Sequence, residues 1–153
     1  MNDILPAKKD FRYWFSQIVA AMMVLLLLYT ALSKFMDHDR FVGAMRHNPL
    51  ISPFAVFLSW AVPITETAIV LLLFIPQSRS VGLLAGSILM AMFTCYVAFM
   101  LLTSSKLPCT CGGILQAMTW RQHLWFNLFF TAISALAATN YPFRRRSHGF
   151  YYW

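Results

Sequence analysis

The stretch YWFSQIVAAMMVLLLLYTAL, residues 13–32, decides the fold class of this chain because its twenty residues include no charge. Roughly 20 mostly apolar residues are needed for a helix to cross the hydrocarbon core of a bilayer, which is about 30 Å thick. The stretch is followed by Ser33-Lys34-Phe35 and not by a small-x-small cleavage site. We therefore expect a membrane-crossing helix that is retained and not a signal peptide that is removed.

Three further apolar segments follow, and Pro, charged or aromatic residues mark their ends. They are residues 54–75, 81–102 and 122–139. The last of them is shorter than the others and contains Asn127. The sequence predicts one all-α transmembrane domain over residues 1–153. We expect it to form a four-helix bundle in the inner membrane of a bacterium. The tail at residues 141–153 is basic and aromatic, as interfacial anchors are.

The composition supports a membrane protein. Apolar residues make up 59% of the chain and charged residues 11%, whereas soluble domains have roughly 45–50% and about 25%. The net charge of +7 comes from basic residues at the ends of apolar segments. We therefore expect contact with anionic lipid and no binding of nucleic acid.

The distribution of basic residues predicts the orientation. Seven lie on the side that holds both termini and five on the opposite side. The first set is Lys8, Lys9, Arg12, Arg79, Arg144, Arg145 and Arg146, and the second is Lys34, Arg40, Arg46, Lys106 and Arg121. By the positive-inside rule the termini are expected to be cytoplasmic. The loops at residues 33–53 and 103–121 would then face the periplasm.

Small residues in the third segment indicate how the helices pack. Gly82 and Gly86 form a G-x-x-x-G step with Ser87 beside it, a pattern that lets membrane helices approach closely. We expect this face to be the packing face of the bundle. Cys95 lies in the middle of the same segment, and we expect a buried free cysteine that behaves as a small hydrophobe.

The stretch LPCTCGG, residues 107–113, carries the strongest candidate for chemistry. Two cysteines separated by one residue, Cys109 and Cys111, can close a disulfide only through a very small ring, and strained exposed disulfides are the oxidising or labile ones. Lys106 would favour the thiolate. Gly112 and Gly113 leave the backbone free to turn and the sulfur atoms approachable. We therefore predict a redox-active disulfide in the oxidising compartment.

Two other interpretations of this loop stay open. The cysteines could form a structural clip or remain idle thiols. They could also bind a metal with His123 or His47, although the sequence lacks a second ligand pair at standard spacing, and we predict no metal site.

Glu66 is the second candidate because a carboxylate in mid-helix is costly in a bilayer and normally faces the bundle interior. Lys34, at the outer end of the first segment, is the leading partner. Glu66 lies twelve residues beyond Phe54, about 18 Å along a helix, which is too deep for easy contact with a lysine at the boundary. The pair could be a polar lock between the first two helices, or Glu66 could handle protons or substrate.

These motifs together resemble the MauE/DoxX-like redox-associated membrane proteins over about residues 14–140. The resemblance rests on ALSKF at 31–35, DRF at 39–41, PITE at 63–66 and CTCGG at 109–113. It implies a DoxX-like bundle and assigns functional positions to Lys34, Glu66, Cys109 and Cys111. One departure is Gly112, which stands where typical members have Phe.

The resemblance implies handling of disulfides in a periplasmic client or a thioredoxin-like partner, of the kind needed to mature methylamine dehydrogenase. The alternative is a non-catalytic scaffold that joins other membrane subunits, with the cysteines as a clip. No bound cofactor is identified beyond the Cys109–Cys111 disulfide. The architecture is also similar to that of quinone-linked disulfide enzymes, but the chain has no paired C-x-x-C and the sequence identifies no quinone site.

Overall fold

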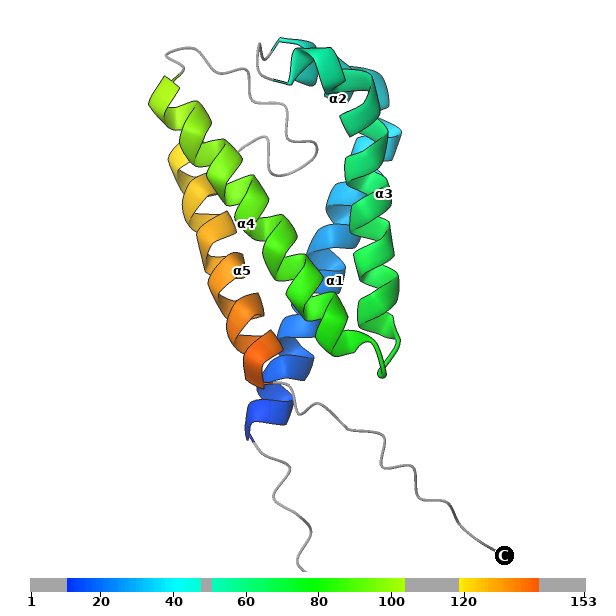
Figure 1. The fold of residues 1–153 in the computed structure, drawn as a ribbon, viewed down its shortest axis with the longest axis vertical. Helices are drawn as coiled ribbons and strands as arrows, with labels where there is room; N and C mark the ends of the chain where they lie inside the picture. Colours follow the sequence, from blue (N-terminus) through cyan, green and yellow to red (C-terminus); the bar gives the residue numbers. More distant parts are fainter. Residues whose placement is uncertain (1–10, 48–50, 104–118, 141–153) are drawn as a thin grey trace, which may run out of the picture.

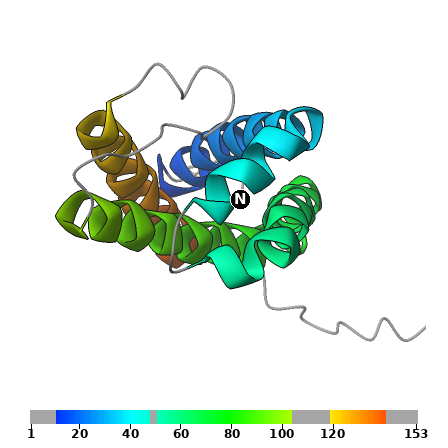
Figure 2. The same ribbon diagram turned by 90° about the horizontal axis from the view of Figure 1, so that it is seen from above.

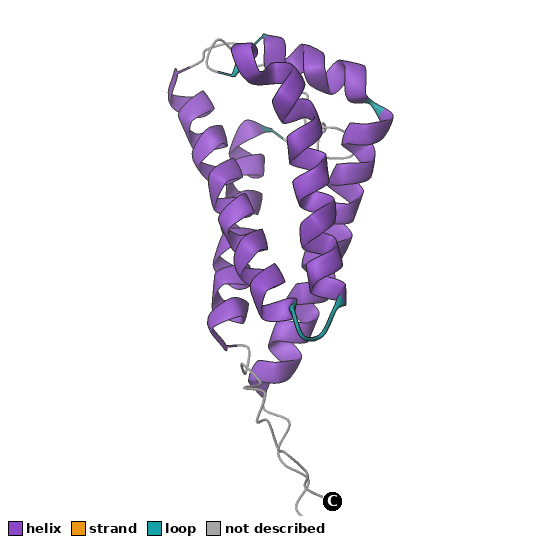
Figure 3. Ribbon diagram, turned by 45° about the vertical axis from the view of Figure 1, so that its right-hand side comes forward, coloured by secondary structure: helices purple, strands orange, loops and turns teal. Residues whose placement is uncertain are grey.

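The computed structural model describes residues 11–47, 51–103 and 119–140, and all regular structure in these ranges is helical (Figure 3). The elements are α1 (Phe11–Met36), α2 (His38–Arg46), the short 3-10 helix η1 (Ser52–Phe54), α3 (Ala55–Phe74), α4 (Arg79–Thr103) and α5 (Trp120–Asn140). The predicted all-α fold is confirmed for this part of the chain.

The long helices run alternately up and down and surround a common core (Figure 1). Helix α1 packs against α3 and α5, and α4 packs against the same two helices. The short helix α2 lies across one end of the bundle and packs mainly on α3 (Figure 2). This end also contains the C-terminus of α4 and the N-terminus of α5.

Among the described residues, three helical segments are long and apolar enough to cross a membrane. They are Phe11–Met36, Ser52–Phe74 and Arg79–Leu102. Helix α5 has 21 residues but is not among them, since Arg121, His123 and Asn127 make it more polar. Helix α1 continues to Met36, four residues beyond its predicted end, and this extension places Lys34 in its last turn.

Apolar side chains lie both inside the bundle and on its outer surface. The inside is filled by side chains such as Met23, Leu27 and Leu73, which are fully or almost fully buried. Leu25 is 70% exposed and Phe57 is 71% exposed on the outside. A helix that is apolar on all sides requires an apolar surrounding, which lipid provides.

The predicted glycine packing face is confirmed near the turn between α3 and α4. A Cβ atom on Gly82 would lie 2.9 Å from the Leu73 side chain and 3.0 Å from its backbone nitrogen. One on Gly86 would lie 2.8 Å from the terminal methyl carbon of Met23. Absence of a side chain at these two positions therefore allows α4 to approach α3 and α1.

We expect Gly82→Ala to destabilise the protein by about 1–3 kcal/mol, because the added methyl group meets backbone that cannot yield easily. Gly86→Ala should cost less, since the flexible end of Met23 can move. Gly43→Ala is the control, as nothing lies within 4 Å of a Cβ there and alanine favours a helix. Thermal unfolding in detergent measures the order of stability of the three variants. Equal melting temperatures for all three would contradict the prediction.

Hydrogen bonds between helices supplement the apolar packing. At one end, the Arg79 guanidinium donates to the side-chain oxygen of Gln17 on α1 and, at 2.9 Å, to the Leu73 carbonyl on α3. Between α4 and α5, the hydroxyl oxygens of Thr94 and Thr131 are 3.2 Å apart. Such bonds hold membrane helices together where no hydrophobic force acts between them.

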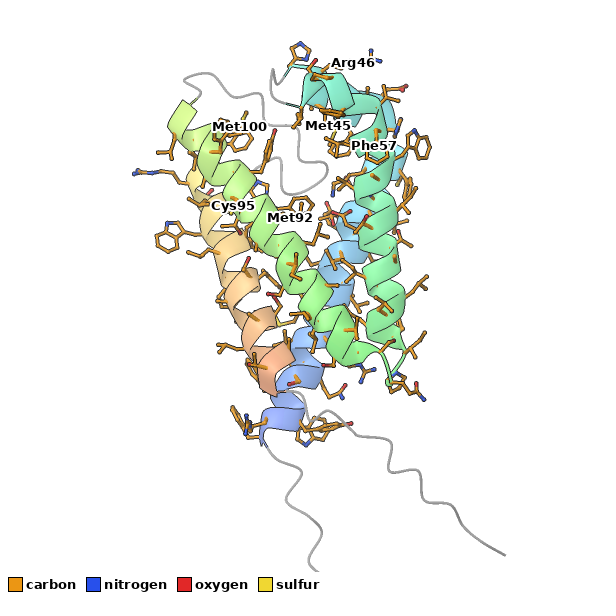
Figure 4. The ribbon with its side chains drawn as sticks, viewed as in Figure 1. Met45, Arg46, Phe57, Met92, Cys95 and Met100 are labelled. Carbon is orange, nitrogen blue, oxygen red and sulfur yellow. The ribbon has the colours of Figure 1, made fainter. Side chains whose placement is uncertain are left out.

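The prediction that Cys95 is buried is wrong. The residue is exposed on the outer face of α4, as Figure 4 shows. Its neighbour Thr94 faces α5 instead, where it contacts Thr131. In lipid a small apolar residue is satisfied on the outside as well as inside, so its hydrophobic character does not determine its burial.

Candidate functional site

Lys34 and Glu66 form an ion pair inside the bundle. The Lys34 ammonium nitrogen Nζ lies 2.6 Å from Glu66 Oε1. The Glu66 side chain is fully buried, and that of Lys34 is 12% exposed. The expected contact between these residues is therefore present and joins α1 to α3.

The directions of the two helices explain how residues at apparently different depths meet. Side chains on a helix tilt toward its N-terminus, and α1 and α3 run in opposite directions. The Lys34 side chain therefore leans into the bundle, where Nζ also lies 3.4 Å from the Thr30 carbonyl. Glu66 leans back toward the start of α3. The tilt of the side chains and the extension of α1 to Met36 together remove the difference in depth expected from the sequence.

Aromatic rings surround the ammonium group. Its nitrogen lies 5.8 Å from the ring centroid of Phe41 on α2 and 5.8 Å from that of Phe93 on α4. Cations are attracted to aromatic faces at distances up to about 6 Å. Four helices thus contribute to the surroundings of the pair.

The second carboxylate oxygen of Glu66, Oε2, differs from Oε1 in its hydrogen bonding. Oε2 is buried and accepts no hydrogen bond from a residue in the described ranges. The nearby Thr30 hydroxyl donates to the Leu27 carbonyl, at 3.1 Å. Buried polar atoms are nearly always hydrogen-bonded in native proteins, so this oxygen is a position at which a ligand or a proton can bind.

The pair forms part of the wall of a cavity of about 330 Å³. All five α-helices, α1 to α5, contribute lining residues, most of them apolar. Figure 4 labels three of the methionines that line it, Met45 on α2 and Met92 and Met100 on α4. At this volume the cavity is at the lower end of the range of ligand pockets, roughly 300–1,000 Å³.

Two further polar residues line the cavity from α5. His123 is 7% exposed and Asn127 is 4% exposed. His123 was predicted only as a ligand of the cysteines' alternative metal site, and Asn127 was not predicted as a site residue. Their i, i+4 spacing on an apolar helix puts both residues on one face. This spacing was the signal in the sequence that could have identified them as site residues.

The cysteine loop lies outside the described residues. This applies to Cys109, Cys111, Lys106, Gly112 and Gly113, and to the alternative of a metal site that includes the two cysteines. Within residues 11–47, 51–103 and 119–140, no group of three His, Cys, Asp or Glu side chains could hold a metal ion.

The fold and the buried pair define a helical membrane protein with a polar site inside an otherwise apolar cavity. The family model of methylamine utilisation protein MauE matches residues 12–140, most of the chain. The chain therefore belongs to the MauE family, which confirms the resemblance seen in the sequence. No match was found among curated proteins or among solved structures.

Proposed function

We propose that this chain is a membrane thiol–disulfide redox protein in which Cys109 and Cys111 exchange electrons with a periplasmic client or a thioredoxin-like partner. Membership of the methylamine utilisation family supports a client in that system, and the disulfide-rich subunit of methylamine dehydrogenase is our candidate. In the exchange, a thiolate attacks a disulfide sulfur atom, one S–S bond forms as another breaks, and the released thiolate takes up a proton.

The observation that carries the proposal is the position of the Lys34–Glu66 cavity relative to the two ends of the cysteine segment. The cavity is lined by Met100, near the end of α4, and by Trp120, the first residue of α5. Cys109 lies six residues after Thr103. Since a chain spans at most about 3.5 Å per residue, its Cα atom is within about 21 Å of that helix end. The two helix ends that flank the cysteine segment, at Thr103 and Trp120, therefore lie at the end of the bundle that contains the cavity.

We also propose that α5 is a fourth membrane span. Its 21 residues measure about 31 Å at 1.5 Å per residue. Its buried polar residues, such as Asn127 and Ser134, face the bundle, whereas Trp125 is 70% exposed and Phe129 is 54% exposed. An apolar outer face with polar groups turned inward is typical of membrane helices. Four spans place both termini on one side, and the charge bias favours the cytoplasm.

The proposed topology predicts that the cysteine loop is accessible from the periplasm. A membrane-impermeant thiol reagent should label Cys109 or Cys111 in reduced cells whose outer membrane has been opened. The measurement should use a Cys95→Ser background, because Cys95 is also exposed. Labelling that requires breach of the inner membrane would reverse the orientation.

The redox function is tested by trapping a client. With Cys111→Ser or Cys109→Ser, one remaining thiol should hold the client as a mixed disulfide, which mass spectrometry identifies after non-reducing electrophoresis. Both variants should lose client oxidation or isomerisation, whereas Cys95→Ser should retain it. If maturation of methylamine dehydrogenase continues in the Cys109→Ser/Cys111→Ser double variant, the chain acts as a scaffold instead.

A further inference from the structure

The cavity extends to a side chain on the outer face of α4. Helices α3 and α4 are close near their connecting turn and separate toward the opposite end (Figure 1), and the cavity is lined by residues from this separated part of both helices. Met92 lines the cavity and is also 63% exposed on the outer face of α4. Met92 therefore joins the cavity to the outer face of α4, and an apolar part of a ligand could extend along it into the acyl-chain region.

The cavity also contains hydrogen-bonding groups, for which an acyl chain offers no partner. Lys34 and Asn127 supply donors, the His123 ring can donate or accept according to its tautomer, and Glu66 Oε2 is an acceptor. Glu66, Asn127 and His123 are each more than nine-tenths buried. Because buried polar groups require partners, the ligand must carry polar atoms, while the aromatic and methionine walls require a largely apolar body.

We propose that this cavity binds the ring of a membrane-soluble quinone, with the ring oxygens facing Lys34 and Glu66 on one side and His123 and Asn127 on the other. A quinone has a planar apolar ring, two carbonyl oxygens that accept hydrogen bonds, and an apolar tail that can extend into lipid past Met92. Its reduced form carries two hydroxyl groups, which can donate to Glu66 Oε2. A phospholipid headgroup matches the site less well, because its phosphate would lie close to the buried Glu66 carboxylate and among mostly apolar walls.

This inference rests on the proposed thiol–disulfide function and names its electron acceptor. When the dithiol of Cys109 and Cys111 reduces a quinone, two S–H bonds break and one S–S bond forms. Two electrons and two protons are transferred to the ring, so that both carbonyl oxygens become hydroxyl groups. A quinone accepts two electrons and two protons, as many as a dithiol releases when it forms a disulfide.

Binding can be measured without turnover. The full chain in nanodiscs of a single phospholipid is titrated with decylubiquinone, and tryptophan fluorescence is recorded, since Trp120 lines the cavity. We expect saturable quenching that Trp120→Phe largely removes. Asn127→Leu should raise the Kd about tenfold, as expected for loss of one hydrogen bond of about 1.4 kcal/mol. A second variant, Val62→Trp, should abolish binding by filling the cavity.

The matched control is Val56→Trp, on the same helix but 55% exposed on the outer surface, which should leave the Kd unchanged. Thermal unfolding shows whether each variant is folded. The Cys109→Ser/Cys111→Ser variant should bind decylubiquinone normally while it fails to capture clients, so the two proposals can fail separately. Non-saturable quenching, equal effects of Val62→Trp and Val56→Trp, or a co-purified phospholipid that decylubiquinone does not displace would overturn the quinone site.

Discussion

Lys34→Met should destabilise the protein by about 3–5 kcal/mol, the cost of removing one partner from a buried ion pair. Its ammonium group is the partner of Glu66 Oε1 at 2.6 Å, and the Glu66 side chain is fully buried. After the substitution, Glu66 must remain charged without a partner or take up a proton. Thermal unfolding in detergent measures the loss of stability. Arg46→Met is the control, because Arg46 is an exposed cation on α2.

The double variant Lys34→Met/Glu66→Leu separates the two interpretations of the pair. Replacement of a buried pair by apolar residues of similar volume is often neutral or stabilising, so the double variant should recover most of the lost stability. If the pair is only a lock between α1 and α3, client oxidation should recover as well. If the pair binds ligand or protons, stability should return without activity, and this second result is the one we expect.

The helices were predictable because a bilayer requires long apolar segments, and the segment at residues 13–32 meets that requirement without a charge. Helix α5 was the hardest to assign, since its composition mixes an apolar outer face with buried His123 and Asn127. The ends of helices are less predictable. Lys34 is polar and marked an apparent boundary, yet α1 continues through it to Met36 because the ammonium group finds partners inside the bundle.

The candidate site was predictable only in part. A carboxylate in an apolar segment must find a partner, and this requirement led from Glu66 to Lys34. The cavity was not predictable, because its shape depends on how far α3 and α4 separate. That separation follows from close contact at Gly82 and Gly86 at the other end of the helices, and a pattern of residue types does not specify the angle that results.

The proposed disulfide of Cys109 and Cys111 should have a reduction potential above about −300 mV, the value below which structural disulfides usually fall. The physical reason is the spacing of the two cysteines, which are separated only by Thr110. Closing so small a ring strains the oxidised form and favours the dithiol. Lys106 acts in the same direction, because a neighbouring cation stabilises a thiolate. Both effects make the disulfide easier to reduce.

The potential is measured by equilibrating the purified chain with glutathione buffers of different ratio, followed by alkylation and determination of the mass shift. Cys95→Ser provides the background, so that only the loop cysteines respond. Lys106→Gln should lower the potential, because it removes the cation that stabilises the reduced thiolate. A pair that remains oxidised in strongly reducing buffer would be a structural clip. In that case electrons could not pass through Cys109 and Cys111, and the redox proposal would fail whatever the cavity binds.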